Sequence, residues 1–234
     1  MPQPKFEIGN SLREMRVAFD ANRQLIVRLT VAFAAMNAIS ALLDIAGPAG
    51  LAISLGITIL LGAAYGGMIT ALICIPGTGG EGAGGLWAAV KPVLARLIWV
   101  TLITALAVLA GVAALIIPGM IIATFLAVAG QTVVVERRGV FESLGRSFEL
   151  VQNNAWRVFG FLVVVGLLSV LLIGIALLIS APLGTGVPGQ LLGNFLSNCL
   201  GTPVIAIGTA VLYTGLSDLK RQSPVQEQEP FNQP

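Results

Sequence analysis

The sequence predicts an all-α membrane protein with six transmembrane helices in three hairpin repeats, each preceded by a cytoplasmic amphipathic helix (an elbow helix). Three observations lead to this prediction: charged residues are scarce, they leave three long apolar runs, and glycine and proline divide each run. The 234 residues include 13 lysines and arginines and 11 aspartates and glutamates, so 10% of the chain is charged. Soluble domains carry about 25% charged residues, so the composition excludes a soluble globular domain.

The apolar runs set the number of spans. Asp44 is the only charged residue in 29–80, and the runs 97–135 and 158–217 contain none. A helix needs about 20 apolar residues to cross a hydrocarbon core roughly 30 Å thick. Each run is therefore too long for one span and long enough for two.

Turn residues then set the limits of the spans. Proline cannot donate a backbone hydrogen bond and glycine permits positive φ, so clusters of the two end helices and reverse the chain. Such clusters lie at 46–50, 117–119 and 181–189. We therefore expect spans at 25–46, 50–74, 94–116, 119–136, 157–180 and 191–216.

The basic residues predict the orientation. All 13 lysines and arginines lie before the first span, in the connections after the second and fourth spans, at the adjoining span ends, or after the sixth span. The three turns on the other side contain no lysine or arginine. Because cytoplasmic loops are enriched in these residues, we expect both termini to be cytoplasmic.

A unit of elbow helix, span, tight turn and span occurs three times, at about 9–74, 83–136 and 139–216. The third elbow helix is the clearest, because apolar side chains recur in it at spacings of three and four. These residues are Phe141, Leu144, Phe148 and Val151. We expect a single membrane domain over 1–218 and a disordered cytoplasmic tail over 219–234, which is polar and has no periodicity.

The sequence contains no recognisable catalytic constellation. It has no histidine, which excludes histidine zinc sites, histidine-based triads and histidine proton relays. Residues 77–82 match the glycine pattern of a dinucleotide site, but that site requires a preceding strand and here the pattern follows a span. We expect a protein without enzymatic activity, catalytic residues, cofactor, metal or nucleic-acid partner.

Small and polar side chains form a stripe at helical spacing on the sixth span, and a polar side chain of the fourth span is placed to face it. These residues are Asn194, Ser197, Asn198, Thr202, Thr209 and Gln131. The stripe is either a packing seam, because polar side chains bond across helix contacts in lipid, or a hydrated pathway. Gly62 and Gly66 on the second span have the spacing of a close helix contact, either within the chain or between two chains.

Two further groups of residues are candidates for contacts at the membrane surfaces. Asp44 is the only charge near the outer surface, either as a solvated carboxylate at a helix end or as a contact for a cation or a lipid head group. Basic and aromatic residues on the cytoplasmic side are suited to the membrane interface. These are Arg138, Arg146, Arg157, Trp156, Trp87 and Lys91.

Residues 133–139, 143–150, 156–160 and 210–219 resemble bacterial six-span proteins related to the membrane domain of glycerophosphoryl diester phosphodiesterases. In that group a glutamate ends a span, a glycine opens an elbow helix and a tryptophan begins the next span, as Glu136, Gly139 and Trp156 do here. The resemblance implies a multi-pass protein of the bacterial plasma (inner) membrane. It does not imply phosphodiesterase activity, which in that group belongs to a separate soluble barrel domain.

We therefore expect a non-enzymatic integral membrane protein that binds lipids or membrane-protein partners and supports envelope organisation. The alternative is a transporter or channel for a small or lipidic solute, with the polar stripe of the sixth span as its pathway. The partners that we expect are membrane lipids, and other membrane proteins or a second copy of the chain are further options.

Overall fold

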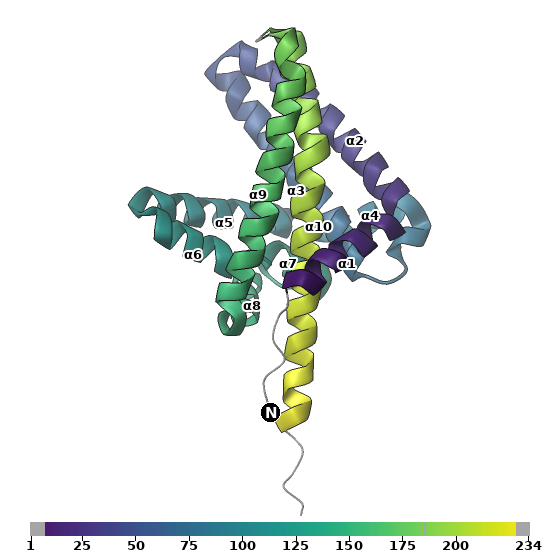
Figure 1. The fold of residues 1–234 in the computed structure, drawn as a ribbon, viewed down its shortest axis with the longest axis vertical. Coiled ribbons are helices and arrows are strands. Elements are labelled where there is room, and N and C mark those ends of the chain that lie inside the picture. Colours follow the sequence, from purple (N-terminus) through teal and green to yellow (C-terminus); the bar gives the residue numbers. More distant parts are fainter. Residues whose placement is uncertain (1–7, 185, 228–234) are drawn as a thin grey trace, which may run out of the picture.

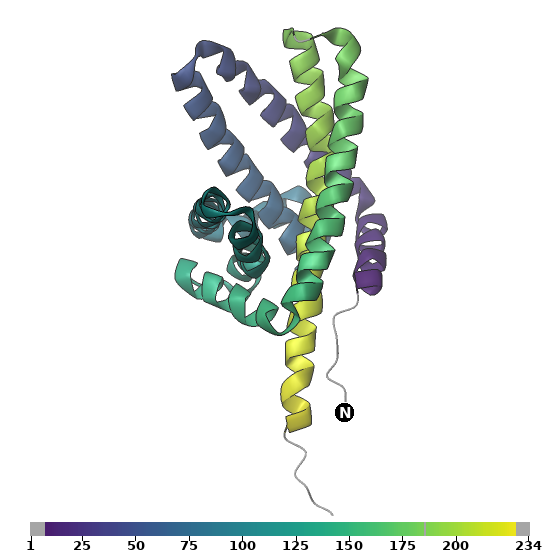
Figure 2. The same cartoon turned by 60° about the vertical axis from the view of Figure 1, so that its left-hand side comes forward.

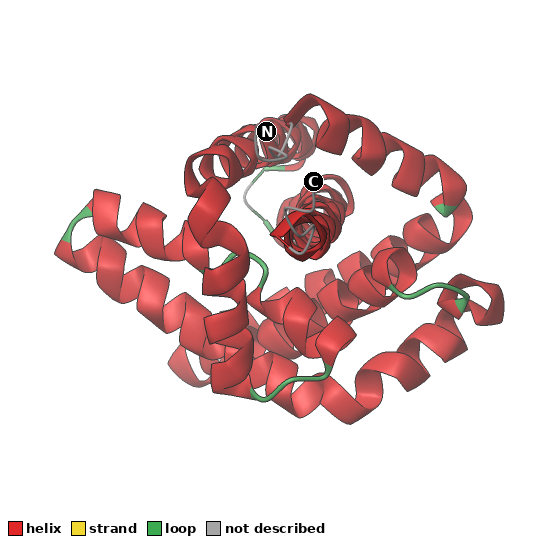
Figure 3. Cartoon of the chain, turned by 90° about the horizontal axis from the view of Figure 1, so that it is seen from below, coloured by secondary structure: helices red, strands yellow, loops and turns green. Residues whose placement is uncertain are grey.

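The computed structural model describes residues 8–184 and 186–227, and all regular elements in this part of the chain are helices (Figure 3). Six of its segments are long and apolar enough to cross a membrane. The number of spans predicted from the sequence is therefore confirmed. The chain is an all-helical protein with the composition and helix lengths of a multi-pass membrane protein.

The first hairpin follows α1 (Ile8–Ala21) and consists of α2 (Arg23–Ser40), the 3-10 turn η1 (Ala41–Ala46) and α3 (Pro48–Cys74). The chain reverses at Gly47, whose φ of 84° is accessible to glycine at little cost. Proline then opens α3, where a missing amide hydrogen breaks no helical hydrogen bond. The predicted limits of both spans agree with the structure within a few residues.

The second hairpin follows α4 (Gly82–Val90) and begins with α5 (Leu94–Ala114). The predicted fourth span, 119–136, is not one helix but two, α6 (Ile116–Phe125) and α7 (Ala129–Glu136). The reason for the break is Ser147, which comes from a different helix. Its hydroxyl donates to the carbonyl oxygen of Phe125 (2.7 Å) and accepts from the amide of Val128 (3.3 Å), so it satisfies backbone groups at the break.

The third hairpin follows α8 (Val140–Val151) and consists of α9 (Ala155–Ser180) and α10 (Val187–Glu227). α10 continues through 219–227, where the sequence predicts a disordered tail, and 228–234 lies outside the described residues. Leu219 packs against the buried cluster around Phe161 and Leu212, and Lys220 Nζ lies 3.1 Å from Glu149 Oε2. These tertiary contacts stabilise the start of the 219–227 extension of α10.

The three hairpins point in different directions. α9 and α10 lie side by side and upright in Figures 1 and 2, whereas the α5–α6 hairpin projects sideways across their direction. The short helices α1, α7 and α8 contact α10, and the end of α10 lies away from the tips of α2–α3 and α9–α10 (Figure 1). The three hairpins therefore share a packed base and separate toward their tips.

Two clusters of buried apolar residues form this base. The first joins α2, α3, α4, α5, α7 and α10, with Tyr65 and Ile69 among its largest members. The second joins α8, α9 and α10 around Phe161 and Leu212. Toward the tips, apolar side chains such as Leu178 are exposed, as expected of surfaces that face lipid rather than water.

Within the chain, glycine permits a close helix contact at a place other than Gly62 and Gly66. A Cβ added to either of these two would meet nothing within 4 Å, so the pair makes no close contact within the chain, and a contact between chains stays a prediction. A Cβ added to Gly111 would lie 2.8 Å from the Cα of Gly119, a backbone atom that cannot rotate away. The tight contact is therefore the one between α5 and α6.

Replacing Gly111 by alanine tests this contact. The added methyl must push two backbones apart, and overpacking of this kind costs about 1–3 kcal/mol of unfolding free energy. The measurement is reversible unfolding in detergent micelles followed by circular dichroism. Gly174→Ala is the matched control, because a Cβ at Gly174 of α9 meets nothing within 4 Å. Equal stability of the two variants would contradict the proposed α5–α6 contact.

Candidate functional site

A groove of about 750 Å³ lies between α3, α5, the connection of α6 to α7, and α10. Its size falls within the range of about 300–1,000 Å³ typical of small-molecule sites. Most of its wall is aliphatic, and the described residues that line it include no charged side chain. Its polar members are Tyr65, Thr101, Thr104, Gln131, Thr202 and Thr209.

The wall of the groove formed by α3 consists partly of glycine. Gly62 and Gly66 line the groove one helical turn apart, and no atom lies within 4 Å of the place where either Cβ would be. The absence of two side chains therefore leaves open space between α3 and its neighbours. A helix with leucine at these positions would fill much of this space.

Gln131 of α7 is a buried polar residue of the groove lining, with 9% of its surface exposed. Its Nε2 lies 2.8 Å from Thr209 Oγ1 on α10. The Thr209 hydroxyl donates its one hydrogen to the carbonyl oxygen of Ile205 or Ala206, so it must accept from Gln131. This fixes the orientation of the amide and leaves Gln131 Oε1 as a buried acceptor without a partner among the described residues.

Thr104 of α5 brings a second buried polar atom to the groove. Its hydroxyl has no hydrogen-bond partner in the described part of the chain. Thr101, one turn earlier, donates to the carbonyl oxygen of Leu97 at 2.8 Å and is satisfied. An unpaired buried polar atom costs about 1–3 kcal/mol. Asn37 and Ser143, outside the groove lining, also have a buried side-chain atom without a partner in the described part of the chain.

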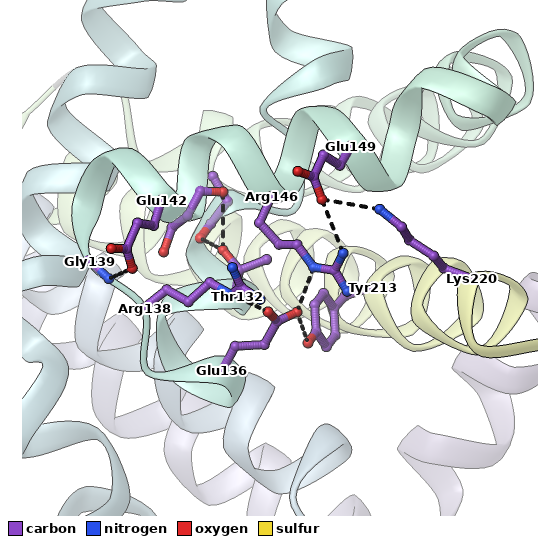
Figure 4. A network of polar contacts seen from close by, with 11 residues as sticks. Thr132, Glu136, Arg138, Gly139, Glu142, Arg146, Glu149, Tyr213 and Lys220 are labelled. Atoms are coloured by element: carbon purple, nitrogen blue, oxygen red, sulfur yellow. Dashed lines mark hydrogen bonds and ion pairs between the residues drawn. The ribbon is translucent and has the colours of Figure 1, made fainter. Parts of the chain in front are cut away.

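A polar junction (Glu136, Arg138, Arg146, Glu149, Tyr213 and Lys220) lies beside the groove and is shown in Figure 4. Glu136 Oε1 accepts from Arg146 Nε at 3.2 Å and from the Tyr213 hydroxyl at 3.0 Å, and its Oε2 accepts from Arg138. Glu149 Oε2 accepts from Arg146 Nη1 at 3.2 Å and from Lys220 at 3.1 Å. The junction thus ties α7, α8 and α10 together.

The junction and the groove share α7 and α10. Gln131 and Glu136 are both on α7, and Thr209 and Tyr213 are one turn apart on α10. The bonds Gln131–Thr209 and Glu136–Tyr213 therefore join the same two helices at two levels. Two such bonds hold α7 in a fixed register against α10.

Comparison with known proteins gives a family and no function. A family described as "Domain of unknown function (DUF7847)" matches residues 26–216. The chain belongs to this family. A search of the curated proteins and a search of the solved structures found no match. The family match includes the groove and all of the junction except Lys220, and it carries no link to glycerophosphoryl diester phosphodiesterases.

The predicted polar stripe of this DUF7847 protein divides into two parts. Thr202, Thr209 and Gln131 line the groove, and the Gln131–Thr209 bond confirms that these two helices face each other there. Asn194, Ser197 and Asn198 lie further along α10, outside the groove lining. There, Asn198 Nδ2 donates to the carbonyl oxygen of Asn194 at 2.8 Å, and its Oδ1 accepts from Thr202.

The predicted interfacial residues also differ in their surroundings. Trp156 is 82% exposed, and Trp87 and Lys91 are exposed as well. Arg138 and Arg146 instead form ion pairs with Glu136. The pattern of basic residues in the sequence does not show this pairing. Arg157 is half-buried.

α8 corresponds to the third predicted elbow helix, so its buried and exposed sides can be compared with the predicted apolar face. Its buried side is formed by Ser143, Ser147, Leu150 and Val151, whereas Phe141 and Phe148 are exposed. The predicted apolar face is therefore divided: Val151 is buried and Leu144 packs against the first cluster, whereas Phe141 and Phe148 are exposed. Serine at two buried positions allows α8 to approach the α6–α7 break closely, and this leaves the phenylalanines on the outer side.

Asp44 lies in the turn η1 at the tip of the first hairpin, where its side chain is exposed. This position agrees with a carboxylate at a helix end. The structure does not bring it near the groove or the junction, because neither lining contains it.

Sequence reasoning missed Thr101, Thr104 and the role of the two glycines. The signal was present: Gly62 and Gly66 share one face of α3, and Thr101 and Thr104 are three apart on α5. What the sequence does not show is that the α5–α6 hairpin turns away and leaves these faces without a partner helix.

Replacing Glu136 by glutamine tests the junction. The amide keeps the shape but removes the charge that Arg138 and Arg146 share, and we expect a loss of about 1–3 kcal/mol of unfolding free energy. Asp20→Asn is the matched control, because the Arg16–Asp20 pair is 87% and 64% exposed and such pairs contribute about 0–1 kcal/mol. Unfolding in detergent micelles measures both variants, and an equally small loss would contradict a central role for Glu136.

Proposed function

We propose that the protein is a non-enzymatic integral membrane protein that binds lipid in the groove between α3, α5, α7 and α10 and supports envelope organisation. One observation carries the proposal: the groove has a volume of about 750 Å³, its wall is mostly aliphatic, and the described residues that line it include no charged side chain. Gly62 and Gly66 of α3 keep this space open. The acyl chain of a lipid fits an apolar groove of this size.

The exposed aromatic side chains of the base support a position at the membrane interface. Phe141 and Trp156 are 80% and 82% exposed, and such side chains are enriched where a protein meets lipid head groups. Trp156 also lines a wholly apolar hollow of about 310 Å³ between α6 and α9. In this proposal, α1, α4 and α8 serve as elbow helices on the cytoplasmic side, and Lys91 and Arg157 lie within reach of anionic head groups.

The remaining parts of the proposal follow from the charge distribution and from the resemblance. The basic residues favour cytoplasmic termini, and the resemblance to the membrane domain of glycerophosphoryl diester phosphodiesterases favours the bacterial plasma membrane. The order of elements favours three repeats, because a short helix precedes each of three hairpins. Other membrane proteins or a second copy of the chain are further partners in this proposal, through the exposed apolar faces of the hairpins.

A transporter or channel is the alternative function. It is favoured by the continuation of polar residues from the groove along α10 toward its tip, through Thr202, Asn198 and Asn194. Against it, Asn198 bonds within α10 to the backbone carbonyl oxygen of Asn194 and to the Thr202 hydroxyl. Asn194 and Asn198 lie outside the groove lining, so replacing both by leucine separates the two functions: a pathway loses solute flux in liposomes, whereas a lipid-binding protein keeps its bound lipid.

Filling the groove tests the proposed function. The double variant Gly62→Leu/Gly66→Leu places two side chains in space that is now open, and we expect at least about a tenfold loss of affinity for lipid, which corresponds to about 1.4 kcal/mol. The measurement is the amount of lipid that stays bound to the purified protein, detected by native mass spectrometry. The helix itself should tolerate the change, because leucine favours helix more than glycine does.

Gly174→Leu is the matched control for this experiment. It makes the same chemical change on α9, where the position is also open but outside the groove lining. We expect this variant to retain lipid like the unmodified protein. If the filled variant retains as much lipid as the control, the groove is not the binding site.

A further inference from the structure

We propose that the outer face of α2 is a second lipid site, which binds an anionic phospholipid through Arg23 and Arg28. This site is separate from the groove, because the described residues that line the groove include none from α2. Three features support it: a hollow that both arginines border, the lack of acidic partners for them, and an exposed apolar row that continues from them along the helix.

Arg23 and Arg28 border one hollow of about 410 Å³ on the surface of α2. Its other described lining residues are Gln24 and Val27, and all four side chains are exposed. The pairs Arg23–Val27 and Gln24–Arg28 are each four residues apart, so their members are neighbours on the helix surface. A guanidinium group presents several donors in one plane and binds phosphate oxygens in pairs. A phosphate in this hollow can therefore be bound by both arginines.

The two arginines have no acidic partner among the residues that the structure describes. Arg138 and Arg146 of the junction are paired with Glu136, whereas none of the ion pairs in the described chain includes Arg23 or Arg28. The described lining of the hollow contains no carboxylate either. Two positive charges therefore border the hollow without compensation, and a negatively charged ligand complements them.

The hollow lies at the base end of α2. This helix contacts α1 and α4, and Figure 1 shows that it begins beside these short helices and runs away from them toward the tip of its hairpin. Basic side chains at the end of a membrane-spanning helix lie at the level of the lipid head groups. The hollow is therefore placed at the depth where a phospholipid carries its phosphate.

An exposed apolar row continues from the hollow toward the tip of the hairpin. Val27, Val31, Ala35 and Ile39 follow Arg23 at successive spacings of four. Val27 and Val31 are 43% and 45% exposed, and Ile39 is 64% exposed. The row is about 24 Å long at 1.5 Å per residue, which exceeds half of a hydrocarbon core roughly 30 Å thick. An acyl chain can lie along this row, so the site suits a lipid rather than a free phosphate.

An adjoining hollow favours a head group with a single negative charge. This hollow, of about 470 Å³, shares Arg23 and Gln24 with the first and also contains Asp20. Asp20 Oδ2 lies 3.9 Å from Arg16 Nε in an exposed pair, so it repels a second negative charge and can accept from a hydroxyl. The head group of phosphatidylglycerol, with one phosphate and two hydroxyls, fits both hollows.

Three lipids with the same acyl chains test the site on the full-length protein in detergent. They are the dioleoyl forms of phosphatidylglycerol, phosphatidylcholine and phosphatidylethanolamine, of which the last two carry a cationic group that cancels the phosphate charge. We expect phosphatidylglycerol to bind about tenfold more tightly than the other two, because two arginines attract its net charge. Native mass spectrometry with each lipid titrated in turn measures the dissociation constants.

Replacing both arginines by glutamine tests their role. Arg23→Gln/Arg28→Gln breaks no ion pair of the described chain, and it should reduce the preference for phosphatidylglycerol to within about twofold. Arg13→Gln/Arg221→Gln is the matched control. It removes the same number of charges from two exposed arginines that border neither hollow, and it should leave the preference unchanged. An equal loss of preference in the two double variants would overturn the site.

Two other results with the unmodified protein would also overturn the site. If phosphatidylethanolamine or phosphatidylcholine binds as tightly as phosphatidylglycerol, net charge does not select the lipid. Glycerophosphoglycerol, the head group without acyl chains, should not displace the lipid at a hundredfold molar excess. Displacement would show a phosphate site that does not use the apolar row.

The groove and the α2 site can be tested separately. Gly62→Leu/Gly66→Leu fills the groove and leaves α2 unchanged, so the preference for phosphatidylglycerol should persist in this variant. Loss of the preference would place the anionic lipid in the groove and overturn the α2 site. If the groove binds no lipid at all, the proposed function fails while the preference that depends on Arg23 and Arg28 remains.

Discussion

The arrangement of the base depends on one carboxylate that three helices share. Glu136 ends α7 and accepts hydrogen bonds from Arg138, from Arg146 on α8 and from Tyr213 on α10. In a chain with 10% charged residues, a partly buried carboxylate is stable only where donors surround it. The donors come from segments far apart in sequence, so satisfying this group requires α7, α8 and α10 to meet at one place.

The groove follows from the same arrangement. α8 lies against the α6–α7 break, where the Ser147 hydroxyl satisfies the backbone at Phe125 and Val128. The break allows α6 to leave the direction of α7 and to extend with α5 away from α3 and α10 (Figure 1). The faces of α3, α5 and α10 that no helix covers become the walls of the groove. Gly62 and Gly66 add no side chains to these walls, and the space between the helices therefore stays open.

Much of the fold could be predicted because lipid imposes simple rules on sequence. The scarcity of charge, the length of the apolar runs and turns such as that at Gly47 predicted the six apolar segments, although the fourth is broken into two helices and the sixth helix extends to Glu227. It was also predictable that Gln131 faces the polar stripe of α10, because polar side chains in apolar spans form hydrogen bonds across helix contacts. Ser147 could not be identified as the cause of the α6–α7 break, because its two bonds cross between elements. The groove was missed for a related reason: an open glycine face and a packed one have the same sequence pattern, as Gly62 and Gly111 show.

By itself, the sequence determined the composition of a membrane protein, the number of apolar helices long enough to cross a bilayer and the segments of the chain in which the charges lie. Those properties depend on composition and on distances along the chain, which the length of a helix across lipid fixes. Only the tertiary structure decided which basic residues are paired, as Arg146 is with Glu136, and which remain at the surface. It alone decided which polar atoms stay without a partner, because hydrogen-bond satisfaction depends on the directions in which separate helices approach one another. The candidate ligand site belongs to this second group of properties.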